Sequence, residues 1–518
     1  MTRTYQGHDE LQLGGGTDSN RSFYLETTLN YDKTFGDHRV SGLFVYNQKT
    51  YRNTTAGDLR YTLAYKTQGI AARATYSWMD RYFAEFNLGY NGSENFSPGK
   101  RFGTFPAFGV GYVISNEKFW SPLSKYITHL KFRYTDGKVG SDAVGDRRFM
   151  YLSEMGGNEG YRFGTGYGYG GGWGISKYGV DVGWSTSRKQ DLGMDINFLN
   201  NSLNFTIDLF KERRKDIFLR RATVPSYTGW TEMPYANLGV IDNKGIELAV
   251  DWNFKLGKNS SLTVRGNFTW NEDKIIENDE PEQRYHWKEK RGTNVNATWG
   301  YIAEGLFMSE DEIADSAKPA GAGNIQIGDI KYRDINEDGV IDDDDIVRIG
   351  QGNLPKIYYG FGADYQIGNF SIGAILQGQA QVTTLLNGSS IRPFSSQSGL
   401  DNLFANIDNR WSEDDPTNQN VFYPRLHWGS ANNNNNNKPS TWWLKDMDYL
   451  RLKQLTITYN LPRKWTDRVK LKNAKIYLMG TNLLTFSKFK LWDPELDTSN
   501  GASYPNLTTY SIGVNINF

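Results

Sequence analysis

The chain has 518 residues, and its 58 basic and 58 acidic side chains give a formal net charge of zero, so no electrostatic argument favours nucleic acid as a partner. It contains no Cys, which excludes a disulfide framework and a thiolate metal site, and its 5 His residues are too dispersed for a His-rich metal centre. No run of about 18 apolar residues occurs, so a transmembrane helix is not expected.

Short segments in which apolar and polar residues alternate recur along the chain, and that period is typical of β-strands. They lie near residues 22–34, 39–51, 70–78, 82–90, 105–115, 127–137, 192–198, 203–209, 246–254, 262–270, 357–367, 369–382, 455–459, 474–478 and 508–518. Aromatic residues make up 14% of a chain whose mean hydropathy is only −0.62. Both features suit strands with one face toward lipid and the other toward a wet lumen.

The connections between these segments alternate in length. Short ones, rich in the Asn, Gly and Asp that tight hairpins require, fall at 79–81, 199–202, 256–260 and 367–369. Long ones fall at 138–184, 213–243, 272–354 and 383–446. Outer-membrane barrels have short periplasmic turns and long extracellular loops. We therefore predict an all-β fold, an antiparallel transmembrane β-barrel with long extracellular loops. Counting strands from 199–202 as periplasmic places the C-terminus in the periplasm.

The final strand has an apolar face made of alternate residues from Tyr510 to Phe518. A half-apolar strand at an open sheet edge invites aggregation, whereas a closed barrel removes the edge. The last residues also resemble the C-terminal signal that outer-membrane barrels present to their insertion machinery, through Ser511, Gly513, Ile516 and Phe518. The alternative is a sandwich strand that happens to be last.

Aromatic residues in the long connections are candidate ligand contacts, because their faces suit stacking on sugar rings. The candidates are Tyr227, Trp230, Tyr235 and Trp428. The alternative is that they are girdle or loop-core residues. The Gly-rich stretch 156–174 is expected to be a flexible loop without strands, and the run Asn432–Asn437 a mobile loop tip.

An acidic stretch within the connection 272–354 has the spacing of a calcium loop. Oxygen ligands at the loop positions of a hand-like site would come from Asp334, Asn336, Asp338, the Val340 carbonyl, Asp342 and Asp345, with Gly339 at the sharp turn. Asp345 replaces the usual bidentate Glu, and the all-oxygen set favours calcium over zinc. The alternative is an acidic, solvated turn. A bound calcium ion would stiffen this loop.

Catalytic constellations are not found: the sequence has neither a G-x-S-x-G elbow nor an H-E-x-x-H motif. We therefore predict that the protein is not an enzyme. An outer-membrane hydrolase stays open as an alternative on fold-level grounds alone.

Several stretches resemble the barrel of SusC-like TonB-dependent transporters of Bacteroidetes, in the order found in that family. They are Asp80–Asn87, Asn91–Phe96, Gly99–Gly103, Gly328–Tyr332, Asp448–Leu455, Gly480–Thr485 and Asp493–Glu495. The resemblance implies a 22-stranded barrel closed by an N-terminal plug, of which residues 1–518 would supply about 15 strands. The plug, the TonB-contacting segment and the first strands have no counterpart here, so we expect a fragment.

The resemblance also implies a function: import of oligosaccharides, sometimes peptides, across the outer membrane of a Gram-negative bacterium. The partners it implies are a SusD-like surface lipoprotein, outer-membrane lipid, the barrel-insertion machinery and, through the missing N-terminal part, the TonB complex. A passive porin or an adhesin-type barrel is the alternative.

Overall fold

The computed structural model describes residues 15–57, 59–145, 147–166, 168–230, 232–321, 324–388, 391–394, 404–427 and 435–518. In these ranges, no helix is both long and apolar enough to cross a membrane. The described strands include fifteen that form one sheet, so the predicted number is confirmed. The fold is all-β and antiparallel, as the alternation predicts.

The strands of this sheet have the following bounds, in the order in which they are hydrogen-bonded: β1 (Asn20–Phe35), β2 (His38–Asn53), β3 (Tyr65–Trp78), β4 (Tyr82–Ser93), β5 (Phe102–Val113), β6 (Ile127–Ser141), β9 (Ser185–Phe198), β10 (Leu203–Arg220), β11 (Tyr235–Gly257), β12 (Ser260–Glu277), β19 (Ile357–Ile367), β20 (Phe370–Ala380), β23 (Tyr449–Asn460), β24 (Asn473–Ser487) and β25 (Thr509–Asn517). Many extend beyond the alternating segments. The connection predicted at 213–243 therefore shrinks to 221–234.

Five two-stranded sheets accompany the large sheet: β7 (Glu154–Phe163) with β8 (Gly168–Lys177), β13 (Thr298–Gly300) with β18 (Val347–Gly350), β14 (Ala303–Leu306) with β16 (Ile330–Tyr332), β15 (Lys318–Pro319) with β17 (Val340–Ile341), and β21 (Thr383–Leu385) with β22 (Leu444–Asp446). The helices are short: α1 (Leu59–Thr62), α2 (Glu310–Asp315), α3 (Arg463–Thr466) and the 3-10 turns η1 (Ile114–Asn116), η2 (Lys118–Trp120), η3 (Ser226–Thr228), η4 (His286–Lys288), η5 (Asp343–Asp345), η6 (Asn435–Asn437) and η7 (Asp467–Val469).

The chain divides into two compact units. The first comprises Met1–Gly111, Thr135–Lys189 and Arg214–Val240, and the second comprises the remainder. In the first unit, β1 and β2 pair over their full length, from Asn20 opposite Asn53 to Phe35 opposite His38. The same unit has a small apolar core of Phe96, Val144, Met150 and Val182.

The hairpin β7–β8 in the first unit corrects the prediction that 156–174 contains no strand. Gly156 pairs with Gly174, and Gly157 pairs with Trp173. Gly weakens a strand but does not prevent ladder hydrogen bonds, because its backbone N–H and C=O remain available. The Gly-rich composition of this stretch therefore does not prevent a hairpin. Trp173 is exposed in this hairpin.

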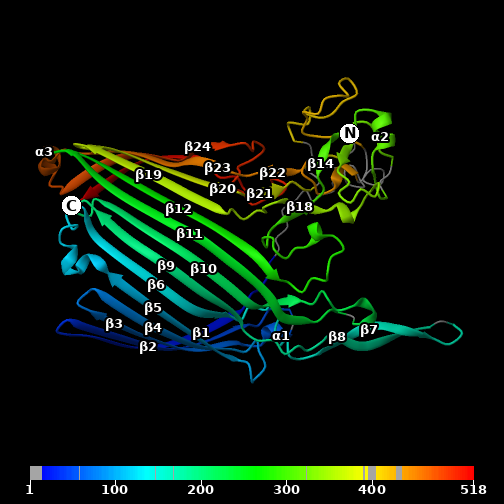
Figure 1. Cartoon of the computed structure of the whole chain (residues 1–518), viewed down its shortest axis with the longest axis horizontal. Helices are drawn as coiled ribbons and strands as arrows, with labels where there is room; N and C mark the ends of the chain where they lie inside the picture. Colours follow the sequence, from blue (N-terminus) through cyan, green and yellow to red (C-terminus); the bar gives the residue numbers. More distant parts are fainter. Residues whose placement is uncertain are drawn as a thin grey trace. The chain divides into compact units, whose positions relative to one another are not determined.

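In the second unit, β12, β19, β20, β23 and β24 run side by side (Figure 1). The short turns of this unit lie at one end of its strands, because the Asn460 N–H donates to the Asn369 carbonyl at 2.8 Å and the Gly368 N–H donates to the Asn259 carbonyl at 2.7 Å. The Lys472 N–H likewise donates to the Asn517 carbonyl at 2.9 Å, so the C-terminus shares this end. The strands β14 and β18 and the helix α2 lie at the other end (Figure 1).

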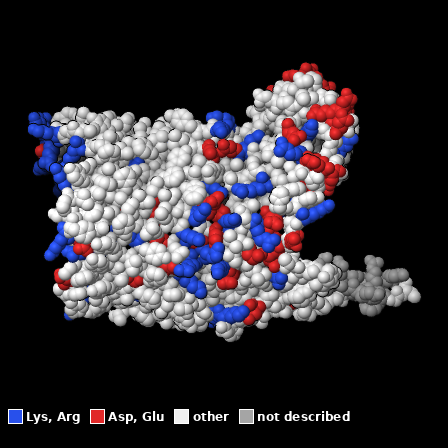
Figure 2. Space-filling model, in the orientation of Figure 1, with Lys and Arg blue, Asp and Glu red and all other residues white. Residues whose placement is uncertain are grey.

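The outward face of the sheet is apolar, as the alternation predicts. In β25 and just beyond it, Tyr510, Ile512, Val514 and Phe518 are between 60% and 82% exposed. Figure 2 shows few charged side chains over β19, β20, β23 and β24 of the second unit, whereas Asp and Glu gather around α2 and Lys and Arg gather around α3. An uncharged band between two charged ends is the surface that a membrane-spanning strand presents.

Candidate ligand-binding site

Three connections of the second unit fold together into what we call the loop domain, which comprises the described residues within 278–356, 381–448 and 488–508. They correspond to the predicted connections 272–354 and 383–446 together with the one between β24 and β25. One apolar cluster contains Tyr301, Leu306, Ile330, Tyr332, Ile341 and Trp411, and a second contains Val382, Leu386, Ile391, Tyr423, Trp443, Met447 and Phe489. Trp442 packs against both clusters. These connections therefore have a core of their own.

A buried ion pair joins the first connection to the second. Asp329 has no exposed side-chain surface, and the Arg425 guanidinium donates to both of its carboxylate oxygens, at 2.9 and 3.1 Å. The Asn436 amide also donates to Asp329, at 2.9 Å, and accepts from the Ile330 N–H at 2.9 Å. The hydrogen bonds that Arg425 and Asn436 donate to this carboxylate are charge-assisted. They offset the cost of burying an ionised group.

Asn435 and Asn436 correct the prediction of a mobile tip at Asn432–Asn437; residues 432–434 lie outside the described residues. Asn435 donates to the Ile330 carbonyl at 2.7 Å, and the Tyr332 hydroxyl donates to the Asn435 carbonyl at 2.6 Å. Burial raises the pKa of the Tyr332 hydroxyl well above its usual range. Side-chain amides with both a donor and an acceptor can replace a strand neighbour, so Asn serves here as a fixed core residue.

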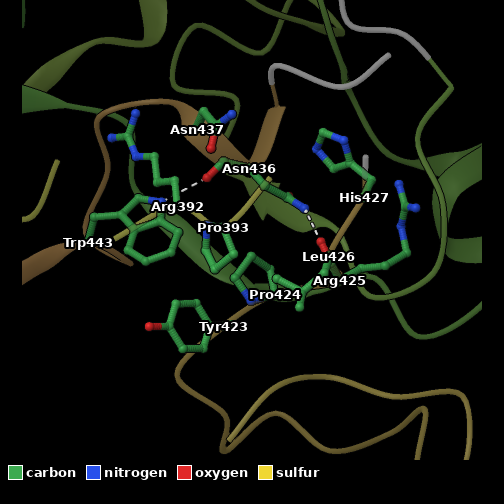
Figure 3. Close-up of a pocket in the computed structure, with 10 residues that line it drawn as sticks. All are labelled: Arg392, Pro393, Tyr423, Pro424, Arg425, Leu426, His427, Asn436, Asn437 and Trp443. Carbon is green, nitrogen blue, oxygen red and sulfur yellow. Dashed lines mark hydrogen bonds between the residues drawn. The ribbon is translucent and has the colours of Figure 1, made fainter. Parts of the chain in front are cut away.

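The network borders a small cavity, which Figure 3 shows between Tyr423, Arg425, Asn436 and Trp443. The Trp443 indole N–H donates to the Asn436 carbonyl at 2.8 Å, and the Asn436 amide donates to the Arg425 carbonyl at 3.1 Å. Its volume of about 20 Å³ is enough for about one water molecule. The cavity is therefore a structural feature and not a ligand site.

A larger hollow of about 600 Å³ lies beside β14. Its lining combines apolar, amide and charged groups: Ala303, Glu304, Gly305, Leu306, Met308, Glu312, Lys331, Gln419, Thr441 and Trp442. Ligand pockets in proteins commonly have volumes of about 300–1,000 Å³ and a few polar groups on an apolar lining. This hollow is the candidate ligand-binding site.

The walls of the hollow are held by specific contacts. The Gln419 amide accepts from the Leu306 N–H at 2.7 Å and donates to the Leu306 carbonyl at 2.9 Å, so it acts as a strand partner for β14. Lys331 pairs with Glu312 at 3.0 Å, and the Met308 N–H donates to the same carboxylate. These contacts, with the backbone N–H first, lower the pKa of Glu312 below its usual range.

A second hollow of about 390 Å³ is lined mainly by hydroxyl and amide groups: Asn296, Thr298, Gly352, Asn353, Thr383, Thr384, Leu385, Asp497, Thr498 and Ser499. Asn353 donates to Asp497 at 2.9 Å across 144 residues of sequence. Its lining offers many hydrogen-bonding groups and one carboxylate, and such groups suit a hydroxyl-rich ligand.

The predicted calcium loop folds as a compact acidic turn. The Asp334 carboxylate accepts from the Gly339 N–H at 2.7 Å, and the buried Asp345 carboxylate accepts from the Ile335 and Asp342 N–H groups at 2.7 and 2.9 Å. Among the described residues no three acidic or His side chains converge to hold a metal. One oxygen, Oδ1 of Asp334, is nevertheless buried without a hydrogen-bond partner. The remaining ligands, at Asn336, Asp338, Val340 and Asp342, lie in the same turn, and the calcium site stays a prediction.

Of the predicted aromatic contacts, Tyr227, Trp230 and Tyr235 belong to the first unit and are not among the residues that line the two hollows. Tyr227 is 87% exposed, and Trp230 lies 4.3 Å from Tyr178, centroid to centroid. Tyr235 stacks on Phe218 at 4.8 Å, and the Arg147 guanidinium lies 4.1 Å from its ring. Trp428 lies outside the described residues. Their role as ligand contacts stays a prediction.

The proposed insertion signal lies on β25 and at the residue that follows it. Gly513 pairs with Tyr477 of β24, and a side chain at 513 would meet the Tyr477 ring at 2.3 Å. Ile516 and Phe518 belong to the exposed apolar face, and Ser511 lies on the opposite face. The close approach of the Tyr477 ring therefore explains why residue 513 is a glycine. Recognition by the insertion machinery stays a prediction.

Sequence reasoning missed the residues that hold the loop domain together, above all Asp329, Arg425 and Gln419. Asp329 was noticed only as part of the Gly328–Tyr332 stretch. Gly328 has φ +88° and faces the Trp411 ring so closely that a Cβ would lie 2.3 Å from it. A glycine directly before an acid, with Ile327 and Ile330 on either side, was the available signal for this turn.

An antiparallel sheet with an apolar outer face, short turns at one end and folded loops at the other defines an outer-membrane β-barrel protein. Residues 2–397 match the family described as TonB dependent receptor-like, beta-barrel. The chain therefore belongs to the TonB-dependent receptor family, and its likeness to SusC confirms the resemblance seen in the sequence. Membership of this family places it in the outer membrane.

Two relatives and one solved structure show the extent of the likeness. The chain is 24% identical over 551 residues to TonB-dependent receptor P3 of Formosa agariphila, covering 95% of this chain and 52% of the relative. It is 25% identical over 480 residues to TonB-dependent receptor SusC of Bacteroides thetaiotaomicron, covering 89% and 45%. The RagAB peptide transporter superposes with a TM-score of 0.74 at 19% identity, covering 96% and 56%. The chain thus spans about half the length of the curated relatives it matches.

Proposed function

We propose that this chain supplies barrel wall and extracellular loops to an outer-membrane nutrient importer that is energised through TonB. The family membership supports this proposal, and the hollow beside β14 is the observation that carries it, since it lies at the loop end of the strands. The relatives are named as TonB-dependent receptors, which favours this function over a passive porin, an adhesin or a hydrolase.

The substrate that we propose is an oligosaccharide. Trp442 offers an aromatic wall to the larger hollow, and the second hollow is lined by hydroxyl and amide groups that match sugar hydroxyls. A peptide is the competing substrate class, because the similar RagAB structure is described as a peptide transporter. The ion pairs in the larger hollow are already satisfied internally, which leaves little free charge for peptide termini.

The proposed partners follow from the same relatives. We propose a SusD-like surface lipoprotein that covers the loop domain from outside, and TonB as the source of energy. The C-terminus and the short turns share one end of the strands, and we assign that end to the periplasm.

Calorimetric titration of the purified, folded chain with neutral oligosaccharides and with short peptides tests the substrate. Met308 lines the larger hollow and is 45% exposed, so Met308→Trp should fill the space and weaken binding by about tenfold or more. Leu354→Trp, at a 59% exposed position of the same loop domain, is the matched control and should bind normally. Binding of peptides alone would reassign the substrate, and binding insensitive to Met308→Trp would remove this hollow from the proposal.

We further propose that the turn Asp334–Asp345 binds calcium. The buried, unpartnered Oδ1 of Asp334 supports this, because a carboxylate oxygen without a partner is costly unless a cation or water completes it. Asp334, Asn336, Asp338, the Val340 carbonyl, Asp342 and Asp345 would be the ligands. Calcium should then slow proteolysis of this turn in the wild type and not in Asp334→Asn. Equal cleavage with calcium and with chelator would argue against the site.

A further inference from the structure

The connection between β23 and β24 carries an unusual concentration of positive charge. Residues 461–472 contain five basic side chains and a single acidic one, Asp467, so the net charge of this segment is +4. The five, which we call the basic turn, are Arg463, Lys464, Arg468, Lys470 and Lys472. All are exposed, and none forms an ion pair with another described residue. Their charge is therefore available to a partner.

The backbone of the basic turn is fixed although its side chains are exposed. It folds as α3 followed by η7, and the Leu461 N–H donates to the Ala474 carbonyl at 2.9 Å where the turn closes. Thr466 is only 1% exposed, and its carbonyl accepts from the Leu471 N–H at 3.0 Å. A fixed backbone presents the basic side chains in a defined direction.

Two apolar side chains accompany the charge. Trp465 is 56% exposed and Val469 is 63% exposed, and they lie four residues apart in the α3–η7 segment. Trp is enriched where a membrane protein crosses the boundary between hydrocarbon and headgroups, and basic side chains there reach toward phosphate.

The basic turn lies directly beyond the apolar band of the sheet. In β24, Ile476 and Leu478 are 41% and 52% exposed, and Ile476 follows Lys472 by about 13 Å of strand. Figure 2 shows the corresponding group of Lys and Arg at the α3 end, next to a surface with few charges. The positive charge is thus at the depth of lipid headgroups if the apolar band spans the hydrocarbon.

The neighbouring turn at the same end lacks this charge. Gly368 and Asn369 join β19 to β20 without a charged residue, although the Asn369 carbonyl accepts from the Asn460 N–H at the edge of the basic turn. A general need for solubility at this end would charge both turns. The concentration in one turn points to a specific partner.

We propose that the basic turn is a docking site for anionic glycerophospholipid headgroups, with Trp465 and Val469 entering the interface and the Arg and Lys side chains binding phosphate. Charge complementarity supports this occupant, since basic groups at an anionic bilayer surface each add favourable energy. Continuity with the lipid-facing strands supports it too. The proposal depends on the membrane location and not on which substrate is transported.

Site-specific quenching tests this proposal in the full chain, because the chain has no Cys and a single introduced thiol carries the only label. Val469→Cys places a fluorophore on the basic turn, and Asn369→Cys places it on the uncharged neighbour. In bilayers or mixed micelles, nitroxide-labelled phosphatidylglycerol should quench the label at 469 about threefold more than labelled phosphatidylcholine, and the two lipids should quench equally at 369. Raising the salt from about 0.1 M to about 1 M should reduce the preference.

Neutralisation supplies the decisive comparison. Changing Arg463, Lys464, Arg468 and Lys470 to Gln should abolish the preference at 469, whereas Arg463→Lys with Arg468→Lys should retain it. Circular dichroism and the unchanged signal at 369 show that each variant is folded. Equal quenching by both lipids at 469, a preference that survives neutralisation, or a preference seen only with lipopolysaccharide would each overturn the proposal.

Discussion

The Arg425 guanidinium donates hydrogen bonds to both oxygens of the Asp329 carboxylate, at 2.9 and 3.1 Å, although the two residues are 96 apart in sequence. Asp329 is completely buried and Arg425 is 17% exposed, so water contributes little to either charge. The pair fastens the β14–β16 connection to the segment that follows Trp411. Together with the hydrogen bonds between Gln419 and Leu306, the pair therefore holds the two walls of the larger hollow together.

Replacing Arg425 alone should destabilise the loop domain more than replacing Arg425 and Asp329 together. Arg425→Met leaves a buried carboxylate without its counter-ion, and we expect the loop domain to lose about 3–5 kcal/mol of stability. The double variant Arg425→Met, Asp329→Leu should recover part of that loss. Hydrogen exchange at Ile330 and Tyr332 measures the effect. Additive losses in the double variant would show that the two side chains do not act as a pair.

Gly513→Ala should destabilise the last hairpin because the new Cβ would lie 2.3 Å from the Tyr477 ring. The ring must move, and we expect a cost of about 1–3 kcal/mol in urea unfolding of the chain in micelles. In a Tyr477→Ser background the same change should cost much less. A cost that does not depend on residue 477 would assign the glycine to another role, such as the insertion signal.

The contacts of Glu312 predict acid sensitivity of α2. The Met308 N–H and Lys331 lower the pKa of Glu312 in the folded chain, so this contribution to stability is complete above the unfolded-state pKa of about 4.3 and is lost as the pH falls through the lower folded-state value. Hydrogen exchange in α2, corrected for its intrinsic pH dependence, should accelerate at low pH. Glu312→Gln should flatten that response, and Asp311→Asn, at an exposed position of the same helix, should not.

Local periodicity was enough to predict the sheet, because every second residue of a membrane-spanning strand tends to be apolar. The turns at 199–202 and 367–369 were predictable for a similar reason: Asn200, Asn201 and Gly368 adopt positive φ, which Asn and Gly tolerate best. The larger hollow was not predictable. Gln419 meets Leu306 across 113 residues and Arg425 meets Asp329 across 96, and such pairings leave no period in the sequence.

Arg451 should anchor the third connection of the loop domain to the sheet. It is 1% exposed, and its guanidinium donates to Asp493, Glu495 and the Thr485 hydroxyl. Arg451→Met leaves two carboxylates without this buried cation, so residues 488–508 should detach and exchange faster. Lys453 also pairs with Glu495, at 3.6 Å, but is 37% exposed, and an exposed pair is worth at most about 1 kcal/mol. Lys453→Met is therefore the matched control. Similar exchange rates in the two variants would mean that the buried Arg451 stabilises the connection no more than the exposed Lys453 does. The apolar contact between Phe489 and Trp492 would then hold the connection in place.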